Sequence, residues 1–464
     1  MYRKRDREQL TLDAFVLPFG GKLRSDNHWV KLAEIMPWDF IEDIYTESMS
    51  TDRGAGAISA RIAFGALFIK EYENFTDERT VEHIAANPYF QYFLGLKEFQ
   101  LEPLFDPSMM VHFRKRFPAD KMEEINKHMF IATKSQDDND DKPPPNKGKM
   151  VLDATCAPAD IRYPSDVSLL NEARENTEQM IEELWEGSDL KGHKTRYSRK
   201  KARNQYLSIA KQKKPKASKS WSVIGKQLGY IKSNIETIGT LLMQQGLDAL
   251  PDKRLIRLMT ICELYRQQNA MYESHTHKCE DRIVSLRQPD IRPIVRGKAG
   301  KRFEFGQKIA VSVVNGYTFI ERQSFNNFNE GITLIASAER YKQNHGSYPE
   351  AIQADQIYRT RKNRAYCKER GIRLSGPKLG RPSKDSDYDK AIEYRDNCER
   401  NIVEGRNGMV KRRFGLDLIM AYLPETALTE AALNVLCMNV RIRRFLRCFL
   451  RFPLFCFPRE IPTT

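Results

Sequence analysis

The sequence predicts a mixed α/β core with a large helical insertion after its first strand, preceded by an all-α N-terminal unit. Four observations favour this fold class. Apolar residues recur at helical spacing over residues 55–131, whereas a short apolar run at 150–152 is typical of a buried strand. A long polar stretch of helical pattern follows at 166–285, and β-branched residues alternate from about residue 294.

The order of elements after residue 150 supports the same class. It reads strand, helical insertion, strand, strand, helix, strand, helix, strand, helix, with Asn315-Gly316 as a turn signal between two strands. The predicted limits are 1–133 for the N-terminal helical domain, 134–149 for an acidic and Pro-rich linker, 150–165 with 290–440 for the α/β core, 166–289 for the basic helical insertion, and 441–464 for a basic apolar C-terminal tail.

Composition narrows the class of protein. With 41% hydrophobic and 30% charged residues, the chain has the composition of a soluble globular protein. No apolar stretch reaches the roughly 18 residues of a membrane span, and no apolar signal core begins the chain, so we expect a cytoplasmic protein. The tail at 441–464 raises the question of a membrane surface, but Pro453 and Pro458 interrupt it, which favours packing on the core or on a partner.

The cysteines and one histidine cluster give weak evidence of metal binding. Eight cysteines are scattered without a C-x-x-C pair, which fits reduced thiols better than disulfides or a zinc cage. His275, His277 and Cys279 alternate without a second ligand pair, so a structural or incidental role is favoured. The acidic run of the linker lacks the alternating ligands of a calcium loop.

The charge of the chain indicates a polyanionic partner. The formal net charge is +15, and residues 191–219 carry twelve Lys and Arg without one acid, with Tyr197, Tyr206 and Trp221 in or beside the run. Such a run suits phosphate contacts and base stacking, although a solvated loop is the alternative. The candidates for contact with DNA in this run are Arg199, Lys200, Lys201 and Arg203.

A second basic segment ends a predicted helix of the N-terminal unit. Asp106-Pro107-Ser108 is a helix start signal with Ser108 as the N-cap, and Pro118 marks the stop. Arg114, Lys115 and Arg116 near the end of this helix suit a DNA-binding module. A helical packing domain with a solvated basic end is an equal alternative.

Three carboxylates form the candidate catalytic group. Asp153 and Asp355 each close a short apolar strand, so they can lie side by side if their strands are neighbours. Close carboxylates repel unless cations neutralise them, and Mg²⁺ prefers such oxygen ligands. Glu404 is the candidate third ligand, because Arg400, Glu404 and Lys411 share one face of a predicted helix. A weak surface ion pair between Arg400 and Glu404 is the alternative.

Several blocks, in order along most of the chain, resemble the DDE transposases of bacterial insertion sequences, in the InsH-like group with an RNase H-like catalytic core. The blocks are FDPSMMVHFRKRFP, VLDATCAPADIRYPSDVSLLNEAR, RPIVRGKAGKRFEFGQKIAVSVVNGY, ADQIYRTRKNRAYCKERGIRLSGPKLGRP and RNIVEGRNGMVKRRFGL. The resemblance implies that Asp153 and Asp355 are the strand aspartates and Glu404 the helical glutamate. Where the family often has a tyrosine, position 397 is Asn, so no tyrosine role is assigned.

The resemblance also implies the reaction. Two Mg²⁺ ions, or Mn²⁺ as a substitute, would serve an in-line displacement at phosphorus, with Asp153 bridging both ions and Asp355 and Glu404 each holding one. Arg400 and Lys411 would position the phosphate. The implied partners are double-stranded DNA, as terminal inverted repeats and target, and a second copy of the chain, without a membrane and in a nucleoid-associated bacterial cytoplasm. A metal-dependent nuclease on the same core and a catalytically silent DNA-binding relative are the alternatives.

Overall fold

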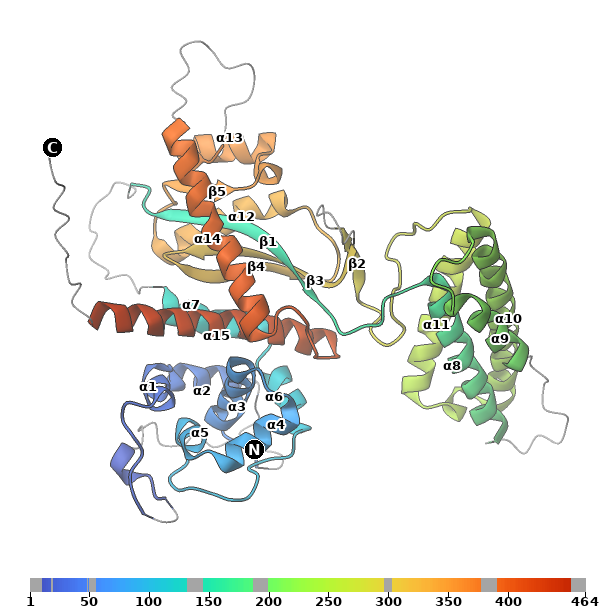
Figure 1. Cartoon of the computed structure of the whole chain (residues 1–464), viewed down its shortest axis with the longest axis horizontal. Helices are drawn as coiled ribbons and strands as arrows, with labels where there is room; N and C mark the ends of the chain where they lie inside the picture. Colours follow the sequence, from blue (N-terminus) through green and yellow to red (C-terminus); the bar gives the residue numbers. More distant parts are fainter. Residues whose placement is uncertain are drawn as a thin grey trace, which may run out of the picture. The chain divides into compact units, whose positions relative to one another are not determined.

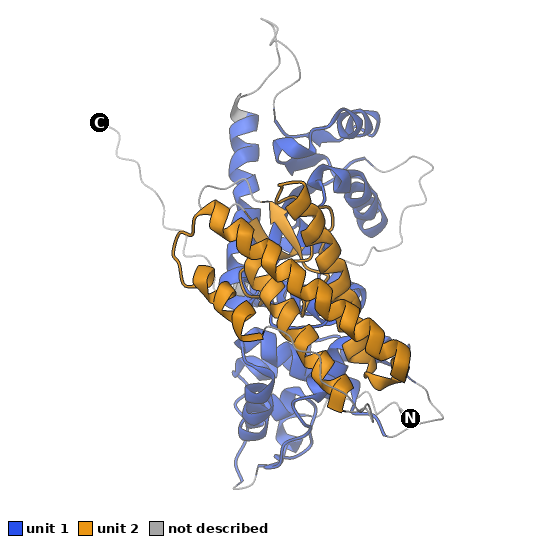
Figure 2. Cartoon of the chain, turned by 90° about the vertical axis from the view of Figure 1, so that its right-hand side faces the viewer, with its two compact units in different colours: residues 1–158, 308–324, 328–464 blue, residues 159–307, 325–327 orange. Residues whose placement is uncertain are grey.

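The computed structural model describes residues 11–17, 20–47, 49, 56–131, 145–186, 199–295, 303–376 and 390–451. The chain divides into two compact units, which Figure 2 colours separately. Unit 1 comprises residues 1–158, 308–324 and 328–464, and unit 2 comprises residues 159–307 and 325–327. Most of the predicted linker, residues 191–198 of the basic run, and the end of the predicted tail lie outside the described residues.

The first part of unit 1 is all helical. Its elements are η1 (Leu12–Ala14), α1 (His28–Ile35), α2 (Trp38–Glu47), α3 (Ala60–Glu73), α4 (Asp77–Ala86), α5 (Pro88–Phe93), α6 (Met109–Arg116) and α7 (Ala119–Phe130). Helix α3 is buried along nearly its whole length, and Phe64 and Phe68 pack there against the rings of Trp38 and Trp29. Because apolar residues lie all round α3, and its buried Lys70 and Glu71 pair with each other, the other helices can pack around it.

The start and end predicted for the basic helix are confirmed. Helix α6 begins after Ser108 and ends before Pro118. The hydroxyl of Ser108 does not cap the helix; instead Asp106 Oδ1 accepts a hydrogen bond of 2.9 Å from the backbone N–H of Ser108. This carboxylate lowers the free energy of the helix N-terminus by satisfying a donor there.

A six-stranded sheet forms the α/β part of the chain, in the order β2-β3-β1-β5-β6, with β4 on β3. Its strands are β1 (Lys149–Pro158), β2 (Arg292–Val295), β3 (Phe303–Val314), β4 (Tyr317–Ser324), β5 (Ala351–Ala354) and β6 (Arg373–Leu374). β5 runs parallel to β1 and to β6, whereas β3 pairs antiparallel with β4 and β2. The mixed α/β class is thereby confirmed, and the four-residue strand β2 is an addition to the predicted order.

The turn between β3 and β4 has the predicted chemistry. Asn315 and Gly316 both have positive φ angles, 51° and 84°. Two positive φ angles in succession are what a tight two-residue hairpin turn requires, and Asn and Gly tolerate them best.

Helices cover the sheet within unit 1. They are α12 (Leu334–His345), α13 (Arg361–Glu369), α14 (Lys390–Phe414) and α15 (Pro424–Arg451), with the single turns η3 (Glu330–Thr333) and η4 (Gln356–Tyr358). Met150, Leu152 and Ile352 of the strands pack with Leu334 and Tyr341 of α12 in one buried cluster. Helix α14 lies across β1 and β5 (Figure 1).

Helices α7 and α15 lie side by side and cover the edge of β4 (Figure 1). Three buried polar groups join them: Asn439 donates to Asn126 Oδ1 (2.9 Å), and both amides donate to the carbonyl of Thr318. Asn439 Oδ1 in turn accepts from the backbone N–H of Thr318 (2.9 Å). Because the edge strand is paired in this way, the N-terminal helices and the sheet share one buried interface.

Helix α15 also continues without a break past residue 441, where the predicted tail begins. The first turns of that tail are therefore helical. Within the part of the chain that the structure describes, no helix is both long and apolar enough to cross a bilayer.

Unit 2 is mainly a bundle of long helices. It contains α8 (Asp166–Glu186), α9 (Arg199–Ala210), α10 (Ala217–Gln245), η2 (Leu247–Ala249) and α11 (Asp252–Glu273). Leu170, Ile231 and Leu264 from three of these helices meet in its core. The limits predicted for the insertion and for the other domains stay predictions.

The histidine cluster after α11 is packed against aromatic and acidic neighbours. The His275 ring stacks on Trp221 with centroids 5.4 Å apart, and His277 Nδ1 lies 3.1 Å from Asp166 Oδ2. Among the described residues, no three acids, histidines or cysteines stand close enough together to hold a metal ion. The contacts of His275 with Trp221 and of His277 with Asp166 fit a structural role of these histidines.

Candidate active site

Asp153 of β1 and Asp355, the residue directly after β5, follow the last paired residues of two neighbouring parallel strands. The last residues that pair between β1 and β5 are Leu152 and Ala354. Each aspartate is the next residue along the chain after its member of this pair. β5 ends there, but β1 continues to Pro158, so the expectation that Asp153 closes a strand is wrong. β1 continues because β3 pairs with it on its other edge. Two carboxylates therefore start from neighbouring points of the sheet.

Asp153 is half-buried, and its surroundings favour the protonated form. Burial raises the pKa of Asp153, and a backbone hydrogen bond at Ala154 opposes that rise. Among the charged neighbours, Glu330 and Glu404 raise this pKa further, whereas Arg400 lowers it. A cation bound beside Asp153 would favour its ionised form, since opposite charge and desolvation act in opposite directions on a carboxyl group.

Two side chains of α14 bind the two aspartates. Arg400 Nη1 forms an ion pair with Asp355 Oδ1, and Asn407 Nδ2 donates to Asp153 Oδ2 over 3.2 Å. Arg400 and Asn407 are about two helical turns apart, so they project from the same face of the helix. Glu404 lies between them on α14 and is exposed to solvent. The helix thus spans both aspartates with Glu404 at its middle.

A polar network fixes the position of α14 on the sheet one turn before Arg400. Gln353 of β5 is fully buried, and its Nε2 donates to Asp396 Oδ1 (3.1 Å) and to Glu399 of α14. Arg373 of β6 donates to Asp396 with both terminal nitrogens, and Lys149 Nζ of β1 donates to Glu399 Oε1 (2.7 Å). Three strands therefore hold the same turn of the helix.

The charges of this network shift the acids that they bind. Burial opposes ionisation of Asp396, but hydrogen bonds from Arg373 and Gln353 outweigh it and lower the pKa of this carboxyl group. The hydrogen bond from Lys149, followed by that from Gln353, lowers the pKa of Glu399. Both carboxylates are therefore ionised at neutral pH and keep the helix docked.

Glu330 is a fourth carboxylate near Asp153 that the sequence analysis did not single out. Its Oε1 lies 2.9 Å from the Nζ of Lys308, a buried lysine of β3 that also donates to the carbonyl of Phe328. Glu330 is in a single helical turn after β4. Sequence periodicity could not identify it, because the segment before α12 has neither strand nor helix pattern.

The three predicted acids have the right ligand chemistry for a hard divalent cation, but their side chains do not converge on one point. All three offer carboxylate oxygens, the ligand type that Mg²⁺ prefers. However, no group of three potential ligands converges at metal-binding distance within the described ranges. Asp355 is engaged by Arg400, and Glu404 is exposed to solvent. Lys411, the other predicted phosphate contact, is half-buried in the last turn of α14.

The predicted basic residues of α6 are mostly engaged inside the protein. Arg114 is buried and paired with Asp77, so in this structure it is not presented to a phosphate, which corrects the expectation for this residue. Arg116 donates to the hydroxyl of Tyr45 at 2.6 Å. Lys115 is exposed, with its Nζ 3.5 Å from a carboxylate oxygen of α15, and its role in DNA binding stays a prediction.

The basic residues of α9 are more accessible. Lys200, Lys201 and Arg203 are exposed on this helix, and the first two line an open hollow with polar neighbours. Arg199 is partly engaged, because its side chain lies 3.2 Å from Glu178 and 3.0 Å from Glu182. The basic surface continues into the following residues, where the exposed lysines are Lys211, Lys213, Lys214, Lys216, Lys219, Lys226 and Lys232.

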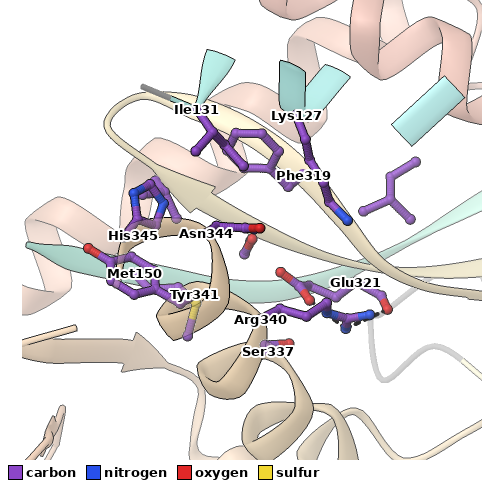
Figure 3. Close-up of a pocket in the computed structure, with 13 residues that line it drawn as sticks. Lys127, Ile131, Met150, Phe319, Glu321, Ser337, Arg340, Tyr341, Asn344 and His345 are labelled. Carbon is purple, nitrogen blue, oxygen red and sulfur yellow. Dashed lines mark hydrogen bonds and ion pairs between the residues drawn. The ribbon is translucent and has the colours of Figure 1, made fainter. Parts of the chain in front are cut away.

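A cavity beneath the sheet in unit 1 is too small to hold a substrate. Its volume is about 20 Å³, which is close to that of one water molecule. Figure 3 shows Arg340 of α12 and Glu321 of β4 next to each other among the residues that line it, and Arg340 Nη2 donates to the backbone carbonyl of Glu321 (2.8 Å). The cavity is therefore part of the packing between α12 and the sheet.

Comparisons with known proteins point to one class. Residues 352–441 match the family described as transposase DDE domain, and residues 18–116 match the transposase domain DUF772. The first match includes Asp355, Arg400 and Glu404. An uncharacterized protein ORF8 in the nfe locus of Rhizobium meliloti is 29% identical over 140 residues. That match covers 30% of this chain and 66% of the relative, slightly less than two thirds of its length. No solved structure matches.

Proposed function

We propose, because residues 352–441 match a transposase DDE domain and residues 18–116 match a transposase domain, that this chain is a DDE transposase that cleaves the ends of an insertion sequence and joins the freed 3′-hydroxyl to target DNA. The observation that carries the proposal is the adjacency of Asp153 and Asp355 at the point where β5 ends. The strand order supports an RNase H-like core. β1 is central, with β3 on one side and the parallel strands β5 and β6 on the other, and this order brings Asp153 and Asp355 next to each other.

The proposed roles follow from the positions of the side chains. Asp153, Asp355 and Glu404 would hold Mg²⁺, or Mn²⁺ in its place, since they offer carboxylate oxygens from β1, from the residue directly after β5 and from the helix that spans them. When bound there, the metal would supply activation of the attacking water or 3′-hydroxyl and stabilisation of the leaving oxygen. Arg400 and Lys411 bind phosphate oxygens and orient the DNA backbone, which needs no proton transfer by either side chain.

Arg400 has two uses in this proposal. Without DNA it pairs with Asp355, and this pair competes with a cation for the same carboxylate. A phosphate of the incoming DNA attracts the guanidinium and releases Asp355. Binding of DNA and completion of the cation site are thereby coupled, and the protein without DNA holds the cation weakly.

The basic surface of α9 and α10 is the proposed site of contact with the DNA backbone outside the catalytic centre. Lys200, Lys201 and Arg203 are exposed there, and no acid interrupts residues 199–235. Each neutralised phosphate releases counterions, so binding through this surface depends strongly on salt. We also propose that two copies of the chain act together, each on one end of the element, and that the protein is located with the nucleoid in the cytoplasm.

The first experiment is cleavage of a DNA fragment that carries the sequence flanking the gene, with Mg²⁺ or with EDTA. Wild-type protein is expected to nick at the element ends only with the metal, and Asp355→Asn is expected to bind the fragment without cutting it. Asp39→Asn, an exposed aspartate of α2, is the matched control and should cut like wild type. Equal cutting by Asp355→Asn would exclude this residue as a ligand.

Two other results separate the alternatives. Metal-dependent cutting scattered along the fragment, without joining to target DNA, would favour a nuclease on the same core. Tight and salt-sensitive binding without any cutting would favour a catalytically silent DNA-binding protein.

A further inference from the structure

Two large apolar side chains are exposed next to the candidate active site. Ile357 lies two residues after Asp355 in η4 and is 45% exposed. Ile332 lies two residues after Glu330 in η3 and is 58% exposed. Single exposed apolar residues are common on protein surfaces, but two on linked turns beside a candidate catalytic carboxylate are a local feature that calls for a partner.

The turns that carry the isoleucines are fixed to each other. Asn363, which is buried, donates through Nδ2 to the carbonyls of Gly331 (2.7 Å) and Tyr358 (2.8 Å), one in each turn. Gly331 approaches so closely that a Cβ at this position would stand 2.6 Å from the carbonyl oxygen of Ile357. Any side chain in place of Gly331 would push the turns apart, so the surface requires glycine here.

This support makes the surface rigid. The ring of Tyr358 is fully buried beneath η4, and Thr333 is buried beneath η3. Each turn therefore anchors one side chain in the core and exposes the isoleucine beside it. A rigid and exposed apolar pair pays little conformational entropy when a partner covers it.

The neighbourhood indicates which partner. Asp355 pairs with Arg400, so a guanidinium that can bind phosphate contacts the carboxylate, and the exposed Ile357 follows that carboxylate by two residues. A duplex whose phosphates reach Arg400 would bring the edges of its bases and sugars close to η3 and η4. Apolar side chains placed at a base step can partly unstack it and bend the duplex.

We propose that Ile332 and Ile357 form an apolar surface that contacts DNA at the base step beside the phosphate to be cut and opens that step. The proposal rests on the function proposed above and adds a determinant of where the DNA is cut. Its partner is double-stranded DNA, recognised by how easily the base step deforms rather than by hydrogen bonds to the bases.

The test uses duplexes of the element end with 2-aminopurine at single positions around the nick, because the emission of this base rises when it unstacks. Binding is measured with full-length protein in EDTA, so the signal does not depend on cleavage. The variants are Ile332→Ser with Ile357→Ser, the conservative Ile332→Met with Ile357→Met, and Leu101→Ser. Leu101 is an apolar residue of unit 1 that is 79% exposed and far from the acids in sequence.

Wild type is expected to raise the emission severalfold at one step next to the nick, and the double Ser variant is expected to lose this rise. Cleavage at the native position should fall by about tenfold in the double Ser variant, since opening a step costs a few kcal/mol. The Met variant and Leu101→Ser should behave like wild type. Equal emission and cleavage in wild type and the double Ser variant would overturn the proposal, as would a wild type that unstacks no base while cutting normally.

Failure of the proposed function is a separate result. If wild type cuts with Mg²⁺ at the element ends and the double Ser variant cuts equally well, the proposed function stands and only this inference fails. A wild-type protein that neither binds nor cuts the fragment removes both.

Discussion

Asn407 of α14 donates a hydrogen bond of 3.2 Å to Asp153 of β1, across 254 residues of sequence. The bond fixes one carboxylate oxygen of Asp153. Asn407 is thus a positioning residue for a candidate metal ligand, and side chains that orient metal ligands are often as important as the ligands.

Replacing Asn407 with Ala is expected to lower the rate of Mg²⁺-dependent cleavage by about ten- to hundredfold, the usual cost of losing a partner that orients a metal ligand. Raising the Mg²⁺ concentration should restore part of the rate if the amide acts through the metal site. Asn401→Ala, at an exposed position of the same helix, is the control. An unchanged rate and Mg²⁺ dependence in Asn407→Ala would show that the bond has no catalytic effect.

The sequence predicted the pair of strand aspartates but not what surrounds them. Asp153 and Asp355 could be found because each follows a short apolar run, a local pattern. The helix that carries Arg400, Glu404 and Lys411 was also expected, and α14 includes all three. The catalytic roles of these residues stay predictions.

Contacts between distant segments could not be predicted in the same way. The bond from Arg373 to Asp396 and the bond from Gln353 to the same carboxylate depend on which strands α14 crosses, and no local pattern encodes this. A glutamine among apolar neighbours in AIQAD was the one available signal of a buried polar network. The burial of Arg114 was missed for the same reason, since Asp77 lies on another helix.

Neutralising two residues of α9 should reduce the salt dependence of DNA binding. For Lys200→Gln with Lys201→Gln, the slope of log K against log salt is expected to become shallower by about 2, since each phosphate contact contributes about 0.9. The measurement is a titration of labelled duplex at several salt concentrations. Lys31→Gln with Lys97→Gln removes the same charge from exposed positions of unit 1 and is the control. Equal slopes for the two double variants would place the DNA elsewhere.

Glu123 makes the free energy of unfolding depend on pH, and one substitution isolates its contribution. Burial on α7 raises the pKa of Glu123 to about 8, although Lys127 and a hydrogen bond from Asn126 oppose the rise. The folded state therefore binds a proton that the unfolded state, with an ordinary pKa of about 4.5, releases as pH rises. The contribution of Glu123 to stability is complete below this unfolded value and is lost as pH rises toward 8.

Glu123→Gln should remove this loss. The free energy of unfolding of the variant is expected to exceed that of wild type at pH 8.5 by on the order of a few kcal/mol, and the difference should shrink toward pH 5. Urea unfolding of both proteins at the two pH values measures it. Glu124→Gln, at an exposed neighbouring position, is the control. A difference that does not change with pH would mean that Glu123 is ionised in the folded protein.

Arg400→Gln is expected to strengthen cation binding in the absence of DNA. The guanidinium occupies Asp355, whose side chain is 54% exposed, so the competing ion pair is screened by solvent and is worth at most about 1 kcal/mol. Removing it should tighten Mn²⁺ binding by about two- to fivefold, measured from the electron paramagnetic resonance signal of free Mn²⁺. Adding an element-end duplex should tighten Mn²⁺ binding in wild type but less in Arg400→Gln, because the variant has no pair to release. Arg395→Gln, on the exposed side of α14, is the control. Weaker Mn²⁺ binding in Arg400→Gln than in wild type, with or without DNA, would contradict the coupling and leave Arg400 as a phosphate contact alone.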